Sequence, residues 1–278
     1  MMIFLHNLSF LLLILTIKYC SSLICYQCNE IVITSSNLTT PSGCTKMNVD
    51  RAYCTITIVL HNNDIGYLNI ESETAHQTFG YNEDFVLLGL TVKNNGSYEY
   101  GLTYHCLTDG CNEPKLNKIQ LLLNSTTIDH YTNNIIHELY TITPEIPLIC
   151  SNYTNSTTPD KCFSHDHKRA VCVTCVASID GITNSVCMDC LTTSDLSTLL
   201  RDERAYMLKT RNTTNHNFEL HCNRPYCNRM DSIERVKHLY RYNFDYDKFP
   251  GNSTSNLILY NKNIIFCFIF ILFIWNKF

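Results

Sequence analysis

Short apolar runs rich in β-branched residues, each bounded by turn residues, recur along the chain. Residues 53–60 form one such run of Thr, Ile and Val, and the segment from His61 to Asp64 ends it. Residues 84–93 form a second, and Asn94 to Gly96 turn the chain into a third over residues 97–105. Bounded runs of this kind are typical of antiparallel strands. The pattern therefore predicts a β-rich interior.

The later part of the chain mixes strand and helix signals. Residues 171–176 and 185–188, with a turn at Asp180-Gly181, predict a β-hairpin. Residues 194–209 carry leucines at helical spacing and predict a helical excursion. Residues 231–242 carry Ile233, Val236 and Leu239 at helical spacing, which indicates a short helix or a stem.

The apolar run from Phe10 to Ile17 is followed by the small residues Cys20-Ser21-Ser22. This run is shorter than the ~20 apolar residues that a membrane-spanning helix needs. We therefore predict a signal peptide over residues 1–22 and entry into the secretory pathway.

A second apolar run, from Ile264 to Trp275, follows a short polar spacer and the small residues 251–255. Small residues, a polar spacer and a hydrophobic tail form the signal for a glycosylphosphatidylinositol (GPI) anchor. We predict attachment at Ser253, with Asn252 and Gly251 as alternatives, and removal of residues 254–278. The competing interpretation is a spanning helix from Leu257, which would place Lys262 in the apolar layer at a cost.

The cysteines follow one pattern twice. In the first copy Leu-Ile-Cys25, Thr-Pro-x2-Cys44 and Arg-Ala-x-Cys54 precede His-Cys106-x4-Cys111-Asn. In the second copy the same neighbours surround Cys150, Cys162, Cys172, Cys222 and Cys227. Repetition at this scale predicts two copies of one small disulfide-stabilised unit.

Cysteine number supports two self-contained units. The chain has 16 cysteines; Cys20 would leave with the signal peptide and Cys267 with the anchor tail. Six would remain in the first copy and eight in the second, and both numbers are even. Disulfides of this density predict an oxidising compartment. Units of this size have thin cores, so each bridge contributes substantially to stability.

These residues resemble the Ly6/uPAR family. The family's opening is similar to Leu23-Ile24-Cys25-Tyr26-Gln27-Cys28. Its second-finger strand is similar to the strand that begins at Tyr53-Cys54, and its closing bridge is similar to Cys106-x4-Cys111-Asn112. The resemblance implies an all-β, disulfide-rich fold of two tandem three-finger domains of short antiparallel strands. The domains would cover residues 23–113 and 148–229, with an inter-domain segment over 114–147 and a stem over 230–253.

The segment before residue 148 is too long and too apolar for a plain linker. It carries Leu116, Ile119 and Leu121-Leu122-Leu123. Two interpretations stay open: it packs one domain on the other, or it covers the first domain locally.

The resemblance also implies disulfide pairs. They are Cys25–Cys54, Cys28–Cys44, Cys106–Cys111, Cys150–Cys172 and Cys222–Cys227. The second copy departs from the pattern, because Tyr153 stands where the first has Cys28, and so Cys162 loses its expected partner.

Four cysteines of the second copy, Cys162, Cys175, Cys187 and Cys190, therefore allow three connectivities. A three-residue loop over 180–182 would place Cys175 opposite Cys187, which favours Cys175–Cys187 and Cys162–Cys190. A two-residue turn would shift this register by one. The spacing Cys172-x2-Cys175 with Cys187-x2-Cys190 also matches a zinc site, but secretion favours disulfides.

Between the two apolar ends, seven Asn-x-Ser/Thr triplets predict surface N-glycosylation. The expected sites are Asn37, Asn95, Asn124, Asn152, Asn155 and Asn212, whereas Asn252 lies beside the expected anchor site. A net charge of −4 disfavours a nucleic-acid surface. Ser164-His165-Asp166-His167 has the residue types of a catalytic triad, but neighbouring residues cannot adopt triad geometry. We therefore expect no enzyme, no metal and no cofactor.

The sequence thus predicts a GPI-anchored glycoprotein on the outer face of the plasma membrane. By resemblance, it would bind an extracellular or membrane protein, such as a receptor or channel, through its stapled finger loops. The loops around His61–Ile65 and Ser178–Thr183 are the expected contact regions. The alternative function is a structural, glycan-bearing coat protein without a specific ligand.

Overall fold

A computed structural model describes residues 22–34, 37–50, 52–62, 65–74, 81–156, 171–192, 196–249 and 251. The expected signal peptide, Cys162, residues 164–167 and the anchor sites Asn252 and Ser253 lie outside this part. The described part is mostly β, its sheets are antiparallel, and six disulfides join its cysteines.

The first half of the chain forms seven strands. A small sheet pairs β1 (Ser22–Gln27) with β3 (Thr45–Asp50). The other strands lie in the order β2-β5-β4-β7-β6, with bounds β2 (Ile31–Thr34), β4 (Ala52–His61), β5 (Ile65–Thr74), β6 (Phe85–Lys93) and β7 (Tyr98–Cys106). The runs predicted over residues 53–60, 84–93 and 97–105 are confirmed as β4, β6 and β7.

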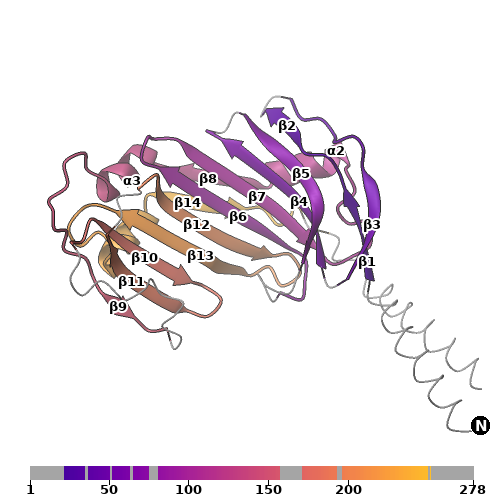
Figure 1. The fold of residues 1–278 in the computed structure, drawn as a ribbon. Helices are drawn as coiled ribbons and strands as arrows, with labels where there is room; N and C mark the ends of the chain where they lie inside the picture. The colour runs from indigo at the N-terminus through magenta and orange to yellow at the C-terminus, as the bar shows by residue number, and fades with distance from the viewer. Residues whose placement is uncertain are drawn as a thin grey trace, which may run out of the picture.

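The second half repeats this order in reverse. Its strands lie as β12-β13-β10-β11-β9, with bounds β9 (Tyr153–Thr154), β10 (Thr174–Asp180), β11 (Ser185–Leu191), β12 (Thr198–Met207) and β13 (Thr213–Cys222). The strands β6 and β12 pair with each other in antiparallel fashion. The two halves therefore share one continuous ten-stranded sheet (Figure 1).

The pairing registers show that an approximate two-fold axis relates the halves. Leu88 of β6 lies opposite Leu102, four residues before Cys106, and Asp202 of β12 lies opposite Phe218, four residues before Cys222. Leu88 and Asp202 are thus equivalent. Leu90 and Arg204 are equivalent by their position two residues further along β6 and β12, although a bulge between Glu203 and Arg204 shifts the pairing of β12 with β13 there. Across the β6–β12 join, Leu88 faces Arg204, Leu90 faces Asp202, and Gly89 faces Glu203. The axis therefore passes through the pair of Gly89 and Glu203.

A helix and a strand follow the closing cysteines of each half. In the first half these are α2 (Leu116–Asn124) and β8 (Thr126–His130), and in the second α4 (Met230–Lys237) and β14 (Tyr240–Phe244). The strands β8 and β14 pair with each other, with Ile128 opposite Tyr242 at the centre. A further helix, α3 (Thr132–Leu139), follows β8. The predicted helix in residues 231–242 is confirmed, but its second part is a strand.

These elements cover one face of the large sheet and enclose the core. On β6 the residues Val86, Leu88, Leu90 and Val92 are fully buried, as period-two alternation requires for strands with one covered face. The helices contribute buried residues three or four positions apart, namely Ile119, Leu122, Ile135, Leu139, Ile233 and Val236. The segment after residue 113 therefore does both things considered for it: it covers the first half and, through β8, joins it to the second.

A buried asparagine closes each half in the same way. The Asn112 side-chain amide donates to the backbone oxygens of Tyr26, Thr55 and Glu71, and its oxygen accepts from the Tyr26 N–H. The Asn228 amide donates to Ser151, Val176 and Asp189, and its oxygen accepts from the Ser151 N–H. Each asparagine thus ties three chain segments together at one end of the sheet.

Four of the disulfide pairs implied by the resemblance are present. They are Cys25–Cys54, Cys28–Cys44, Cys106–Cys111 and Cys222–Cys227.

The other pairs in the second half differ from the prediction. Cys150 bonds to Cys175, not to Cys172, and Cys172 bonds to Cys190. The register gives the reason: Cys54 lies opposite Cys106, and the residue opposite Cys222 is Cys175. Cys175 is therefore the counterpart of Cys54, although Cys172 has the matching neighbours in sequence.

The pair Cys175–Cys187 is also wrong, and so is Cys162–Cys190. The predicted hairpin is confirmed, but Asp180 lies opposite Ser185, so its loop spans residues 181–184 and is longer than assumed. This loop places Cys187 opposite Ser178 and Cys190 opposite Cys175. Cys187 is itself disulfide-bonded.

The helical excursion predicted within residues 194–209 is wrong, because residues 198–207 form the central strand β12. Pairing with β6 on one side and β13 on the other overrides the local leucine spacing. Among the described residues, no helix has the length and apolar character to cross a membrane. The disulfides indicate folding in an oxidising, secretory or extracellular environment.

Candidate functional site

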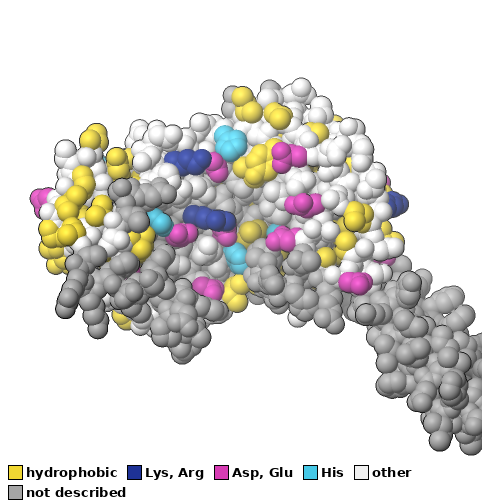
Figure 2. All heavy atoms as spheres, in the orientation of Figure 1, with side chains coloured by type: hydrophobic (Ala, Val, Ile, Leu, Met, Phe, Trp, Pro, Cys, Tyr) yellow, Lys and Arg dark blue, Asp and Glu magenta, His cyan; other side chains and the backbone are white. Residues whose placement is uncertain are grey.

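The face of the large sheet opposite the helices carries a polar groove of about 780 Å³. Strands from both halves form its floor, including β4, β5, β6, β7, β12 and β13. Figure 2 shows acidic, basic and histidine side chains gathered across the middle of this face. The volume lies within the range of about 300–1,000 Å³ that is usual for ligand pockets.

Two glycines lower the floor of the groove beside the two-fold axis. A row of facing residues runs from Val59 through Gly101 and Gly89 to Glu203. A Cβ atom on Gly101 would meet only the Gly89 oxygen, at 4.0 Å, and one on Gly89 would lie 3.6 Å from Glu203 Cγ. Both are ordinary van der Waals distances, so the fold does not require glycine at either position.

Glycine inside a strand costs stability, about 0.5–1 kcal/mol relative to alanine. It often marks a bulge or a place where a ligand approaches the backbone. The register between β6 and β7 is continuous through Gly89 and Gly101, so there is no bulge at this pair. The glycine floor therefore leaves the backbone of β6 and β7 open to close approach by a ligand.

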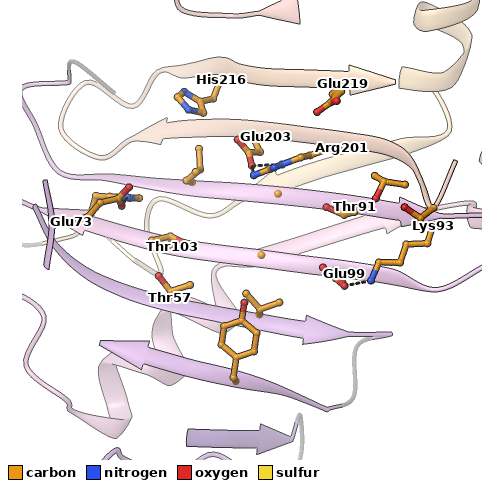
Figure 3. A pocket seen from close by; sticks show the side chains of 18 of the residues that line it. Thr57, Glu73, Thr91, Lys93, Glu99, Thr103, Arg201, Glu203, His216 and Glu219 are labelled. Atoms are coloured by element: carbon orange, nitrogen blue, oxygen red, sulfur yellow. Dashed lines mark hydrogen bonds and ion pairs between the residues drawn. The ribbon is translucent and has the colours of Figure 1, made fainter. Parts of the chain in front are cut away.

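Charged groups stand around this floor in pairs (Figure 3). Arg201 donates to Glu203 from Nε at 2.9 Å and from a terminal nitrogen at 2.7 Å, and Lys93 donates to Glu99. Two further carboxylates contact histidines. The Nε2 atom of His105 lies 3.0 Å from a carboxylate oxygen of Glu73, and the Nε2 atom of His221 lies 2.7 Å from one of Glu219.

The surroundings of two of these groups shift their pKa values. The hydrogen bond from His221 lowers the pKa of the Glu219 carboxyl, and Arg201 acts in the same direction. Burial lowers the pKa of the His216 imidazole, against the attraction of Glu203 and Asp180. At neutral pH the groove therefore presents ionised carboxylates as hydrogen-bond acceptors, a chemistry suited to binding a ligand that carries donors.

The described residues of both loops expected to contact a partner are not among the residues that line this groove. Since β6 and β12 run antiparallel, Phe85 at one end of β6 faces Met207, and Lys93 at the other end faces Thr198. Equivalent strands of the two halves consequently run in opposite directions. The loops at His61–Ile65 and Ser178–Thr183 lie toward opposite ends of the molecule, and their described residues do not line the groove.

The six expected glycosylation sites all lie on exposed residues: Asn37, Asn95, Asn124, Asn152, Asn155 and Asn212. None of them lines the groove.

The spacing that matched zinc has a different explanation in the structure. The sulfur atoms of Cys150, Cys172 and Cys190 lie within 4.8 Å of one another. They belong to two neighbouring disulfides, with the Cys150 and Cys172 sulfurs 3.0 Å apart. Zinc binds thiolates, and these sulfurs are oxidised.

The groove residues were missed by the sequence analysis. A signal was present on β7, where Glu99, Gly101, Thr103 and His105 alternate with the buried Tyr100, Leu102 and Tyr104. This alternation identifies a polar sheet face. Its partner strands from the other half could not be identified from it.

Comparison with known proteins adds no identification, because no family model, curated protein or solved structure matches this chain.

Proposed function

We propose that this chain is a non-enzymatic, GPI-anchored cell-surface glycoprotein with two tandem Ly6/uPAR-like three-finger domains, and that it recognises an extracellular or membrane protein. The single observation that carries the recognition role is the groove, because residues of both halves line it. We place the main contact on this open face of the sheet. The disulfides, the cysteine pattern and the exposed glycosylation triplets support an extracellular setting.

Rigidity supports binding at this face. The bridges and the buried asparagines fix the strands that form the floor, so little order has to be gained when a partner binds. The glycans expected at the exposed triplets would cover other parts of the surface and leave the groove accessible.

Binding of the purified full chain to an array of secreted and membrane proteins tests this proposal. We expect a hit whose affinity falls at least about tenfold in Gly101→Val, because the new side chain projects into the groove from a Cβ whose nearest neighbour is the Gly89 oxygen at 4.0 Å. Matched variants with alanine at Ser178 and Thr183 should bind as the unaltered protein does. If the alanine variants lose binding and Gly101→Val keeps it, the finger loops are the contact and the groove is not.

A second candidate is a coat glycoprotein without a specific ligand, which the six exposed triplets favour. Mass spectrometry of glycan occupancy separates the two. Full occupancy with no array partner supports the coat role. Phospholipase release of the intact protein from cells tests the lipid anchor, and disulfide mapping of the released protein tests the pairs described above.

A further inference from the structure

The charges that line the groove do not balance. Four glutamates point toward it from four strands, whereas the described residues of the lining include two permanent cations, Lys93 and Arg201. With neutral histidines the lining therefore carries two net negative charges. The excess lies with Glu73 and Glu219, since each of these contacts a histidine, whereas Glu99 and Glu203 contact Lys93 and Arg201.

Three histidines can change this sign. His105, His216 and His221 line the groove, and histidine side chains titrate between about pH 8 and pH 5. Each proton that they take adds one positive charge, so two protons cancel the two net negative charges of the described lining. Burial lowers the pKa of His216 and so opposes a proton there. Glu73 on β5 contacts His105, and Glu219 on β13 contacts His221. Arg201 and Glu203 on β12, Asp180 on β10 and His105 act on His216. The other charged groups nearby are Lys93 on β6 and His61 on β4, which both contact Glu99 on β7.

From this geometry we infer that the groove receives a basic, extended segment of a protein partner at neutral pH and releases it on acidification. The glycine floor admits the segment close to the sheet, and the surrounding carboxylates accept from its lysine or arginine head groups. Acidification adds protons to the histidines, which then compete for the same carboxylates and repel the segment. This inference rests on the proposed function and names the partner chemistry.

The geometry favours a cationic side chain over an anionic one. An anion would have to displace a glutamate from Lys93 or Arg201, and both of those contacts are formed within the groove. A cation can instead approach Glu73 and Glu219 from solvent, since their side chains remain 40% and 35% exposed.

Two matched peptides test the inference with the full chain purified from producing cells. The probe is acetyl-Ala-Arg-Ala-Arg-Ala-amide, and its control carries citrulline, the neutral isostere, in place of arginine. Calorimetric and saturation-transfer NMR titrations at pH 7.4 and pH 5.5 measure binding. We expect the arginine peptide to bind about tenfold more tightly than the citrulline peptide at pH 7.4, from a few exposed charge pairs, and to lose this preference at pH 5.5.

Variants place the binding site. Glu219→Gln should weaken the arginine peptide about fivefold, whereas Glu113→Gln, which alters an exposed pair outside the groove, should change nothing. Gly101→Val should block both peptides while the thermal transition stays at or above that of the unaltered protein. Equal binding of the two peptides, no saturable binding, or insensitivity to Gly101→Val would overturn the inference. An array partner that still depends on Gly101 would leave the proposed function standing.

Discussion

The two halves of the molecule share a backbone register but differ in the chemistry at their centre. In the first half Leu88 and Leu90 are fully buried. Their counterparts in the second half are Asp202 and Arg204, an ion pair with an N–O distance of 3.3 Å. The Arg204 guanidinium also lies 4.7 Å from the centre of the Tyr242 ring, and the Tyr242 hydroxyl donates to the Asp202 carbonyl.

This difference shows which features specify the fold. An apolar pair on β6 and an ion pair on β12 occupy equivalent positions. The residue type at these positions therefore does not determine the strand order. The disulfide that opens each half and the asparagine that closes it recur in both, with the same backbone partners in register. We therefore expect the shared contacts to dominate stability and the differing ones to modify it.

The largest effect is expected at the closing asparagines. Asn112→Ala or Asn228→Ala would leave several buried backbone groups without partners, each costing about 1–3 kcal/mol. Each variant should lose at least about 3 kcal/mol of unfolding free energy in chemical denaturation. The two losses should agree within about 1 kcal/mol, because both side chains make the same set of bonds. The control is Asn117→Ala, at an exposed position of α2. Unequal losses for the two closing asparagines would argue against their equivalence.

The next largest effect concerns the buried ion pair. Arg204→Leu leaves Asp202, which is only 2% exposed, without its cation and should cost about 2–3 kcal/mol. The double variant Asp202→Leu with Arg204→Leu restores the apolar chemistry of the first half, and its stability should return to near the unaltered value. Thermal denaturation of the single and double variants measures this. A double variant less stable than the single one would show that the second half depends on its charges.

The smallest effect is a difference in acid response. The pKa of Glu219 is lowered chiefly by His221, so this carboxylate adds stability above its unfolded pKa of about 4.3 that is lost as the pH falls through its folded value. Thr103 occupies the equivalent position in the first half. Glu219→Thr should flatten the stability curve below pH 4.5 by less than about 1 kcal/mol, since the side chain is partly exposed. Denaturant midpoints from pH 3 to pH 7 provide the measurement.

The repeated cysteine pattern allowed the duplication and the closing bridges to be predicted, and the bounded apolar runs allowed several strands to be predicted. The pattern predicted the wrong disulfide partner for Cys150, because the residues next to a cysteine and its register in the sheet indicate different counterparts of Cys54. Arg-Ala-Val-Cys172 matches Arg-Ala-Tyr-Cys54 by residue type, yet register makes Cys175 the counterpart. Register depends on loop length and on long-range pairing, and the loop after Asp180 proved longer than the turn assumed.

The groove depends on a contact that local patterns do not contain. Residues 84–93 were predicted as a strand. Their partner β12 was predicted as a finger with a helical excursion, because Leu196, Leu199 and Leu200 have helical spacing. The join between β6 and β12 brings together residues more than 100 positions apart. Without that join, Arg201, Glu203 and Glu219 could not be placed beside Gly89 and Gly101.

The axis through Gly89 and Glu203 has a consequence for how this surface can vary. A homodimer with the same interface would place each residue on the axis against its own copy, so a glycine there would meet a glycine. Because one chain supplies both halves, the two positions at the axis can differ, and Gly89 lies opposite Glu203. Covalent linkage thus permits an asymmetric binding face on a nearly symmetric scaffold.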